Sequence, residues 1–222
     1  MDEEYRFSAP GRVEIGGNHT DHQHGRVLAA AINLESKAIV RRNCEGKIRV
    51  ISEGYDPVEI DVWDLGVHEE EKNTTAALIR GVASAFTECG CKLGGLDAKV
   101  SSTVLPGSGL SSSAAFEVLI GRILNGLFFE DKLTPVQIAQ IGQYAENVYF
   151  GKPCGLMDQT SNIDVRQITE ITLAVIFFQT KISDKLLGVF ENISVYAFID
   201  LTHILLHYVL ITCVRDLVGR HS

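Results

Sequence analysis

Apolar and polar positions recur with regular spacing through most of this 222-residue chain. Segments rich in apolar and β-branched residues, bounded by polar or turn residues, predict β-strands. They lie at 5–13, 26–41, 47–51, 58–62 and 96–104. The turn signal Gly54-Tyr-Asp-Pro57 separates the third segment from the fourth and predicts a hairpin there.

Apolar residues at helical spacing predict three helices between and after these strands. The first covers 74–86, with Asn73 as its cap candidate. The second covers 112–129, directly after a loop rich in glycine and serine. The third covers 134–149, because Thr134-Pro135 fits an N-cap followed by a proline in the first turn.

The character of the chain changes after about residue 162. The last proline is Pro153, and only Gly188 and Gly219 follow Gly155. The remaining segment is poor in turn residues and rich in Ile, Val and Leu.

The most membrane-like stretch, 193–214, contains Asp200, His203 and His207. These side chains are costly in lipid, so no transmembrane helix is predicted there. The two histidines have the spacing of a zinc-binding helix but lack the glutamate of the protease motif. This favours two histidines on a mostly apolar helix.

Composition narrows the class of protein. Hydrophobic residues make up 45% of the chain and charged residues 22%, which fits a soluble globular protein. A formal net charge of −8 argues against a nucleic-acid partner, because phosphate backbones attract clustered Lys and Arg. The N-terminal Met-Asp-Glu-Glu lacks the basic and apolar regions of a secretory signal, so a cytoplasmic protein without a membrane partner is expected.

The cysteines are an odd and unpatterned set of five: Cys44, Cys89, Cys91, Cys154 and Cys213. This pattern favours reduced thiols over a disulfide framework. The pair separated by one glycine, Cys89 and Cys91, lacks a second pair of ligands. A turn with two thiols is therefore favoured over a metal site.

The Gly/Ser loop, 105–115, has the sequence Leu-Pro-Gly-Ser-Gly-Leu-Ser-Ser-Ser-Ala-Ala. Gly107 and Gly109 allow a tight turn, and a helix is expected to open at Ser111. Such a helix start attracts an anion, most usefully a phosphate. The loop contains no lysine, so it is not a Walker A loop, and other residues must supply positive charge. Small residues that merely allow close strand–helix packing are the alternative interpretation.

A polar loop that follows Arg12 carries His19, Asp21, His22 and His24. Imidazole and carboxylate groups suit zinc or manganese, so one interpretation is a metallohydrolase. These groups lie within six consecutive residues and lack a distant set of partner ligands. That favours a sugar site, in which Asp, Asn and His side chains receive hydroxyls. A solvated polar loop is the third interpretation.

Asp158 follows the turn Cys154-Gly-Leu-Met157, and Glu146 lies twelve residues before it. An aspartate after an apolar pair can act as a general base that orients a substrate hydroxyl, and a glutamate at this distance can reach Mg²⁺. Taken alone, the segment fits a helix cap equally well.

Three of these segments, taken together, resemble the GHMP kinase superfamily and specifically the galactokinases. Ala9-Pro-Gly-Arg-Val-Glu-Ile-Gly-Gly-Asn-His-Thr-Asp21 is similar to the galactokinase signature around Gly-Arg-x-Asn-Leu-Ile-Gly-Glu-His-x-Asp-Tyr. Residues 106–115 are similar to the phosphate loop of the superfamily, and 146–159 to the segment that carries its catalytic aspartate. The three occur in the family's order with compatible spacing and cover roughly residues 5 to 162.

The resemblance implies an α+β fold. It would be a GHMP kinase N-terminal domain of the ribosomal protein S5 domain 2-like type, with a mixed sheet backed by helices. It also implies an ATP- and Mg²⁺-dependent kinase that phosphorylates the C1 hydroxyl of galactose. A monomer is expected.

Carried over residue by residue, the resemblance implies that Asp158 acts as base toward the C1 hydroxyl and that Arg12 stabilises the transferring phosphoryl group. Mg²⁺ would be held by Glu146 with Ser112 or Ser113. The sugar would be lined by Asn18, His19, Asp21 and Gly155. ATP would be bound by Pro106, Gly107, Ser108, Gly109, Leu110, Ser111, Ser112, Ser113 and Ala114.

The sequence departs from the family in two ways. Asn18 stands where the family usually has an acidic residue, and His22 replaces a tyrosine, while Glu14 and Gly16 also differ. Residues 163–222 match nothing in the family, whose members are much longer and later carry a Gly-x-Gly-x-Gly-Gly motif. We therefore expect an incomplete C-terminal half, a frameshifted or otherwise aberrant tail, and weak or no turnover. A non-catalytic protein that binds sugar or nucleotide is the alternative function.

Overall fold

The computed structural model describes residues 3–16 and 28–162. These residues lie in the first of two compact units, 1–178 and 179–222. The segment 17–27 and the expected aberrant tail, 163–222, lie outside the described residues. The strands are β1 (Tyr5–Gly16), β2 (Leu28–Asn43), β3 (Lys47–Ser52), β4 (Val58–Asp61) and β5 (Gly95–Ser102). The helices are α1 (Thr75–Glu88), α2 (Ser112–Phe128), α3 (Pro135–Tyr144) and α4 (Met157–Ser161), with a 3₁₀ turn η2 (Glu69–Glu71) and a π turn η3 (Ala145–Phe150).

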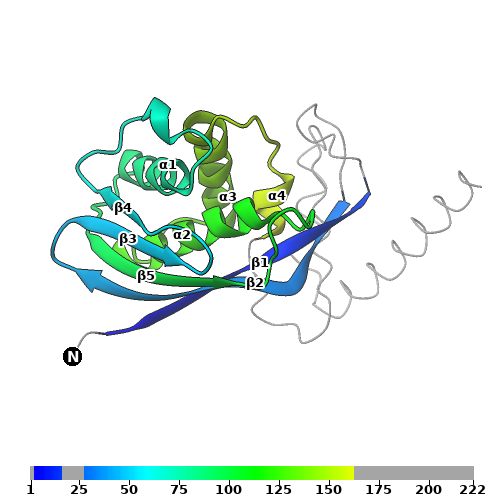
Figure 1. The fold of residues 1–222 in the computed structure, drawn as a ribbon, viewed down its shortest axis with the longest axis horizontal. Helices are drawn as coiled ribbons and strands as arrows, with labels where there is room; N and C mark the ends of the chain where they lie inside the picture. Colours follow the sequence, from blue (N-terminus) through cyan, green and yellow to red (C-terminus); the bar gives the residue numbers. More distant parts are fainter. Residues whose placement is uncertain (1–2, 17–27, 163–222) are drawn as a thin grey trace, which may run out of the picture. The chain divides into compact units, whose positions relative to one another are not determined.

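The strands form a mixed sheet in the order β1-β2-β5-β3-β4 (Figure 1). Neighbouring strands are antiparallel except β3 and β5, which are parallel. The parallel pair requires a crossover connection, and α1 supplies it. Each predicted strand is present, and β3 and β4 form the predicted hairpin. The expected mixed sheet is confirmed.

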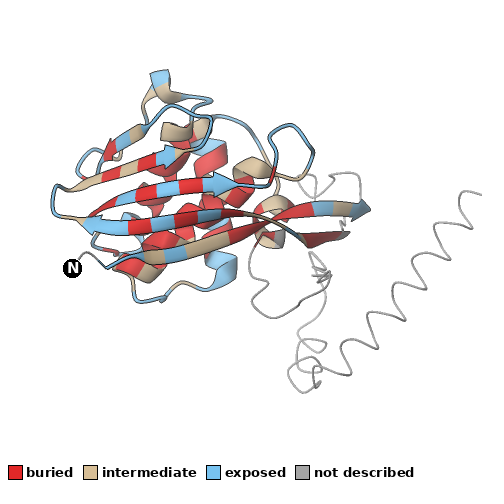
Figure 2. Cartoon of the chain, turned by 60° about the horizontal axis from the view of Figure 1, so that its bottom comes forward, coloured by how far each residue is buried: buried red, intermediate tan, exposed pale blue. Residues whose placement is uncertain are grey.

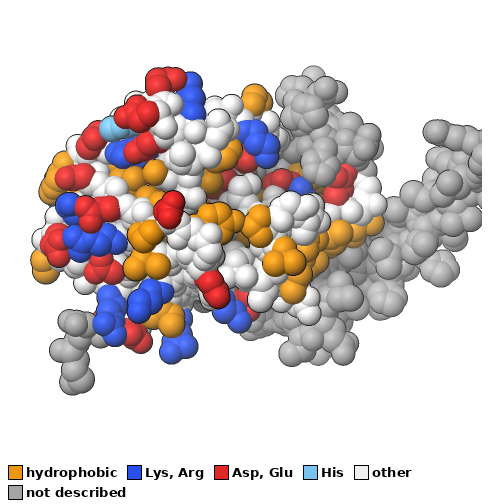
Figure 3. Space-filling view, in the orientation of Figure 1, with side chains coloured by type: hydrophobic (Ala, Val, Ile, Leu, Met, Phe, Trp, Pro, Cys, Tyr) orange, Lys and Arg blue, Asp and Glu red, His pale blue; other side chains and the backbone are white. Residues whose placement is uncertain are grey.

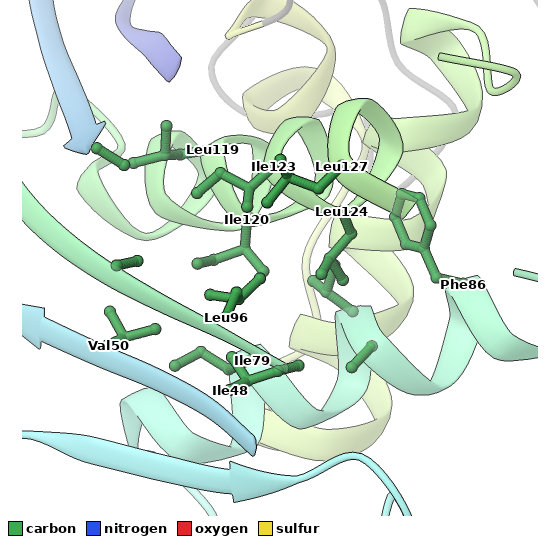
Figure 4. Close-up of a cluster of buried hydrophobic side chains, with 14 of the residues drawn as sticks. Ile48, Val50, Ile79, Phe86, Leu96, Leu119, Ile120, Ile123, Leu124 and Leu127 are labelled. Atoms are coloured by element: carbon green, nitrogen blue, oxygen red, sulfur yellow. The ribbon is translucent and has the colours of Figure 1, made fainter. Parts of the chain in front are cut away.

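The helices pack against one face of this sheet and bury its apolar side chains (Figures 1 and 2). Along β5, Leu96, Ala98 and Val100 are buried, whereas the residues between them are exposed. This is the two-residue period that a strand with one buried face requires. Figure 4 shows apolar side chains of the sheet meeting those of two helices, among them Ile48, Val50, Leu96, Ile79, Phe86, Leu119, Ile120, Ile123, Leu124 and Leu127.

The first helix begins one residue beyond its predicted cap. Thr74 is the N-cap of α1, and its hydroxyl accepts the N–H of Ala77 at 3.4 Å. Asn73 was predicted for this role, and that prediction is wrong. Thr74 has the extended backbone typical of an N-cap and makes the capping bond, whereas Asn73 is left-handed with φ 62°.

The third predicted helix starts as expected but changes its hydrogen-bond pattern before it ends. Thr134 forms a capping box with Gln137, and proline follows at the first position of α3. At Ala145 the helix passes into the π turn η3. Such turns occur often at functional sites because they shift the side chains that follow.

A buried arginine holds the segment between β4 and α1 against the helices. Arg80 donates from Nε and Nη2 to the carboxylate of Glu71 at 2.8 and 2.7 Å, and these hydrogen bonds lower the pKa of Glu71. Charged side chains of both signs cover this segment and the β3–β4 hairpin (Figure 3).

Within the part of the chain that the structure describes, no helix has the length and apolar character needed to cross a membrane. The stretch 193–214 lies outside that part.

Candidate active site

The Gly/Ser loop enters α2 through three left-handed residues. The angle φ is 73° at Gly107, 75° at Gly109 and 59° at Ser111. Glycine adopts this conformation without steric cost, but serine does not. Ser111 is the N-cap residue, so the helix opens where predicted. Its hydroxyl makes no capping hydrogen bond to the helix. It donates instead to Oδ2 of Asp158 at 2.6 Å.

Hydrogen bonds join Arg12 of β1 to this loop. The backbone N–H of Arg12 donates to the carbonyl of Leu110 at 3.1 Å, and its Nη1 donates to the carbonyl of Gly109 at 2.7 Å. A Cβ on Gly11 would lie 3.0 Å from Val104 and 3.2 Å from the carbonyl oxygen of Leu110. Only glycine allows this close approach without displacing the loop. The approach places Arg12 directly against the loop.

Asp158, on α4, meets Arg12 although 146 residues separate the two in sequence. Its Oδ1 accepts from Nε of Arg12 at 2.7 Å and lies 2.5 Å from Nη2. The side chain of Arg12 is 4% exposed and that of Asp158 is 26% exposed. The carboxylate is therefore fixed by a buried cation and still reaches solvent. Such a group can accept a proton from a substrate hydroxyl.

Glu146 lies in the π turn and faces the turn 150–155. Its carbonyl accepts from the N–H groups of Gly151 and Lys152 at 3.0 and 3.1 Å. Its buried carboxylate accepts from Nζ of Lys152 at 3.3 Å, and its negative charge raises the pKa of Lys152. Burial also raises the pKa of the nearby Cys154 thiol.

Gln159, next to Asp158, contacts two buried carboxylates. Its Nε2 donates to Oε2 of Glu117 and to Oε2 of Glu146, at 3.0 Å in each case. Burial, and then the nearby charge of Glu146, raise the pKa of Glu117 well above its ordinary value. The neutral form of Glu117 is therefore favoured.

Comparisons with known proteins match two segments of the chain to family models. Residues 77–163 match the family model of the GHMP kinases N terminal domain, and residues 2–42 match that of the galactokinase galactose-binding signature. The chain is 42% identical over 158 residues to a galactokinase of Streptomyces coelicolor and 35% identical over 153 residues to one of Clostridium tetani. These segments of the chain are therefore similar to the galactokinases of the GHMP kinase superfamily. These alignments cover 70% and 69% of this chain but 40% and 39% of the two relatives.

Solved structures share the fold of the described domain. Lactococcus lactis galactokinase complexed with galactose superposes with a TM-score of 0.66 at 28% identity, covering 72% of this chain and 41% of that chain. Methanococcus jannaschii mevalonate kinase superposes with a TM-score of 0.61 at 18% identity, covering 72% and 51%. The second likeness shows the fold alone. The chain thus spans about two fifths of the length of the galactokinases that it matches.

The structure brings together the candidate residues from three separate segments. Arg12, Asp158 and the Gly/Ser loop are in contact, and Glu146 joins them through Gln159. Gly155 lies half-buried just before α4, whereas Ala114 is fully buried in the first turn of α2. The candidate sugar residues and the histidines of the alternative metal site lie outside the described residues: Asn18, His19, Asp21, His22 and His24. The described cysteines, Cys44, Cys89, Cys91 and Cys154, are free thiols.

Sequence reasoning missed Glu117 altogether and assigned no role to Gln159. The signal for Glu117 is its position between Phe116 and Val118 in an otherwise apolar stretch of α2. A glutamate is almost never fully buried unless it has a partner. Gln159 offered no such signal, because a polar residue after Asp158 fits an exposed helix turn equally well.

Proposed function

We propose that this chain carries the N-terminal catalytic domain of a galactokinase, which transfers the γ-phosphoryl group of ATP to the C1 hydroxyl of galactose. One observation carries the proposal. Asp158 bonds both to the buried Arg12 and to Ser111 of the Gly/Ser loop, so a proton acceptor, a cation and an anion-binding loop share one place. The galactokinases among the relatives support the choice of reaction.

In this mechanism Asp158 orients the sugar hydroxyl and takes its proton. Each carboxylate oxygen has two lone pairs, so Oδ2 can accept the substrate proton beside the hydroxyl of Ser111. The sugar oxygen then bonds to the γ-phosphorus as the bond from that phosphorus to the bridging oxygen breaks, and ADP leaves. Arg12 stabilises the negative charge of the transferring group, which the loop cannot do with a lysine of its own.

ATP would be bound by residues 106–114, and Mg²⁺ by Glu146 with Ser112 or Ser113. The donor set fits a cation, because Oε1 of Glu146 already bonds to the ammonium group of Lys152. Mg²⁺ commonly takes one or two carboxylates together with substrate phosphates and water. When bound, the ion would neutralise charge on the phosphates.

Asn18, His19, Asp21 and Gly155 would line the sugar. We assign the kinase domain to residues 1–162 and leave 163–222 as a separate, unassigned segment. A cytoplasmic location follows from the reduced cysteines and from the soluble substrates.

The test incubates the purified 222-residue chain with ATP, Mg²⁺ and a panel of sugars. Galactose-dependent ADP release that Asp158→Asn abolishes supports the proposal. Asp56→Asn, in the exposed turn of the β3–β4 hairpin, is the matched control and should retain the rate. Saturable binding of galactose or ATP without turnover would favour a sensor or an inactive fragment of a kinase. Zinc-dependent hydrolysis that needs no ATP would favour a metallohydrolase.

A further inference from the structure

Helix α4 carries two adjacent side chains that bond to different parts of the domain. Asp158 bonds to Arg12 and Ser111, at the open part of the site. Gln159 is completely buried and bonds to Glu117 and Glu146. The helix has only five residues, and so short a helix depends on tertiary contacts for its orientation.

We propose that Gln159 is a positioning residue: by bridging Glu117 of α2 and Glu146 of η3, it fixes the orientation of α4 and so holds Asp158 against Arg12. The proposal deepens the kinase function proposed above and rests on it. Gln159 would not touch the substrate and would act only through Asp158.

The geometry of the amide supports this role. The Nε2 group donates to an oxygen of Glu117 and to an oxygen of Glu146, so one amide group is shared by side chains of two elements. The remaining oxygens, Oε1 of Gln159 and Oε1 of Glu117, find no hydrogen-bond partner among the described residues. The two bonds from Nε2, with a longer contact to Cys154 Sγ at 3.7 Å, are therefore the polar contacts that hold this side chain.

The packing around the bridge leaves no room for a different arrangement. A Cβ on Gly142 of α3 would lie 3.0 Å from Cγ of Gln159 and 3.2 Å from Oε2 of Glu117. Helix α3 thus packs directly against the side chains of Gln159 and Glu117. A side chain one methylene shorter could not span both carboxylates, and packing of this density resists the shift that would compensate.

The test compares Gln159→Asn and Glu117→Gln with the unchanged chain. Gln159→Asn keeps an amide but shortens the bridge, whereas Glu117→Gln keeps the acceptor oxygen that Nε2 contacts. Gln140→Asn, on the exposed face of α3, is the matched control. Two quantities are measured: hydrogen exchange of Nε–H of Arg12 by NMR, which reports its bond to Asp158, and kcat and KM for galactose-dependent ADP release.

We expect Gln159→Asn to speed exchange at Arg12 at least about tenfold and to lower kcat by at least about tenfold, with KM changed less than about threefold. Glu117→Gln and the control should stay within about threefold of the unchanged chain in all three quantities. A Gln159→Asn protein that melts at a lower temperature but keeps its exchange rate and kcat would overturn the proposal. If the unchanged chain shows no turnover, as expected of an incomplete C-terminal half, the kinetic arm bears only on the proposed function, and the exchange rates alone decide whether Gln159 positions Asp158.

Discussion

Arg12 shows how one side chain serves two parts of the site. Its guanidinium contacts Asp158 through Nε and Nη2 and the carbonyl of Gly109 through Nη1. A lysine has a single ammonium group and cannot make all three contacts. Arg12→Lys is therefore expected to lower kcat by about 100-fold, the loss typical for a preorganised charge at a reacting group. Steady-state ADP release measures kcat. Arg6→Lys, at an exposed position of the same strand, should leave kcat unchanged. Equal rates for the two variants would exclude Arg12 from the chemistry.

Ser111 combines backbone strain with a useful hydroxyl. Ser111→Ala and Ser111→Gly both remove the bond to Asp158, but only glycine relieves the left-handed conformation at φ 59°. Strain of this kind costs about 1 to 2 kcal/mol. The glycine variant should therefore melt about 2 to 8 °C above the alanine variant, as calorimetry would show. Identical melting temperatures would mean that the backbone at this position is not strained.

How far single residues can be predicted from sequence depends on the signal they carry. Arg12, Asp158 and Glu146 stand in motifs whose residue types suit the chemistry, and the structure places them together or one contact apart. Glu117 and Gln159 carry no comparable motif. Their role depends on burial, which is a property of the packed helices and not of the neighbouring residues in sequence.

The packing of α1 against η3 depends on a glycine. A Cβ on Gly81 would lie 2.8 Å from Cβ and 2.9 Å from Cα of Ala145, and a backbone atom cannot yield as a flexible side chain can. Alanine favours helices by about 1 kcal/mol over glycine, but overpacking a core costs about 1 to 3 kcal/mol. Gly81→Ala is therefore expected to lower the melting temperature despite its better helix propensity. Thr87→Ala, at an exposed position of the same helix, also raises helix propensity but introduces no clash. It should therefore not lower the melting temperature.

The segment before α1 should give the domain a pH dependence at acid pH. The hydrogen bonds from Arg80 lower the pKa of Glu71 in the folded state, so the folded protein releases this proton more readily than the unfolded chain. The resulting stability is present above the unfolded pKa of Glu71 and is lost as the pH falls through the folded value. Glu71→Gln should therefore melt below the unchanged chain at neutral pH, and the gap should close below about pH 4. Calorimetry across this pH range measures the difference in melting temperature between the two proteins. Glu70→Gln, at an exposed position, is the control. A difference that does not change with pH would contradict the expected linkage.

Elements were predicted well where periodicity alone decides them. All five strands and the three longer helices follow from apolar spacing, which records the face that an element buries. Two details depend on backbone geometry that spacing does not record. Asn73 and Thr74 are both good caps, and only the left-handed φ of Asn73 separates them. The change from α to π at Ala145 leaves the apolar pattern helical, so sequence gave no sign of it.

At the scale of the whole molecule, the site joins the beginning and the end of the described chain. Arg12 lies on the first strand and Asp158 on the last helix. The order of the strands was not predictable from periodicity, because spacing shows which face is buried but not which strand is the neighbour. The insertion of β5 between β2 and β3 therefore emerged only from the structure. Since the contact between Arg12 and Asp158 joins the first strand to the last helix of the described chain, binding at the proposed site should be linked to unfolding of the whole domain.

This linkage gives a test that needs no turnover. A ligand present at about 100 times its Kd stabilises the folded state by about 2.7 kcal/mol, so ATP with Mg²⁺ should raise the melting temperature of the chain by several degrees. Removal of Mg²⁺ with a chelator should reduce the shift, because the cation proposed at Glu146 would be lost with it. Glu146→Gln should make the shift insensitive to the chelator, whereas Glu88→Gln, exposed at the end of α1, should respond as the unchanged chain does. Neutralising a carboxylate that holds Mg²⁺ must weaken the binding of the ion. If the chelator reduces the shift equally in both variants, Mg²⁺ binds at a place other than Glu146.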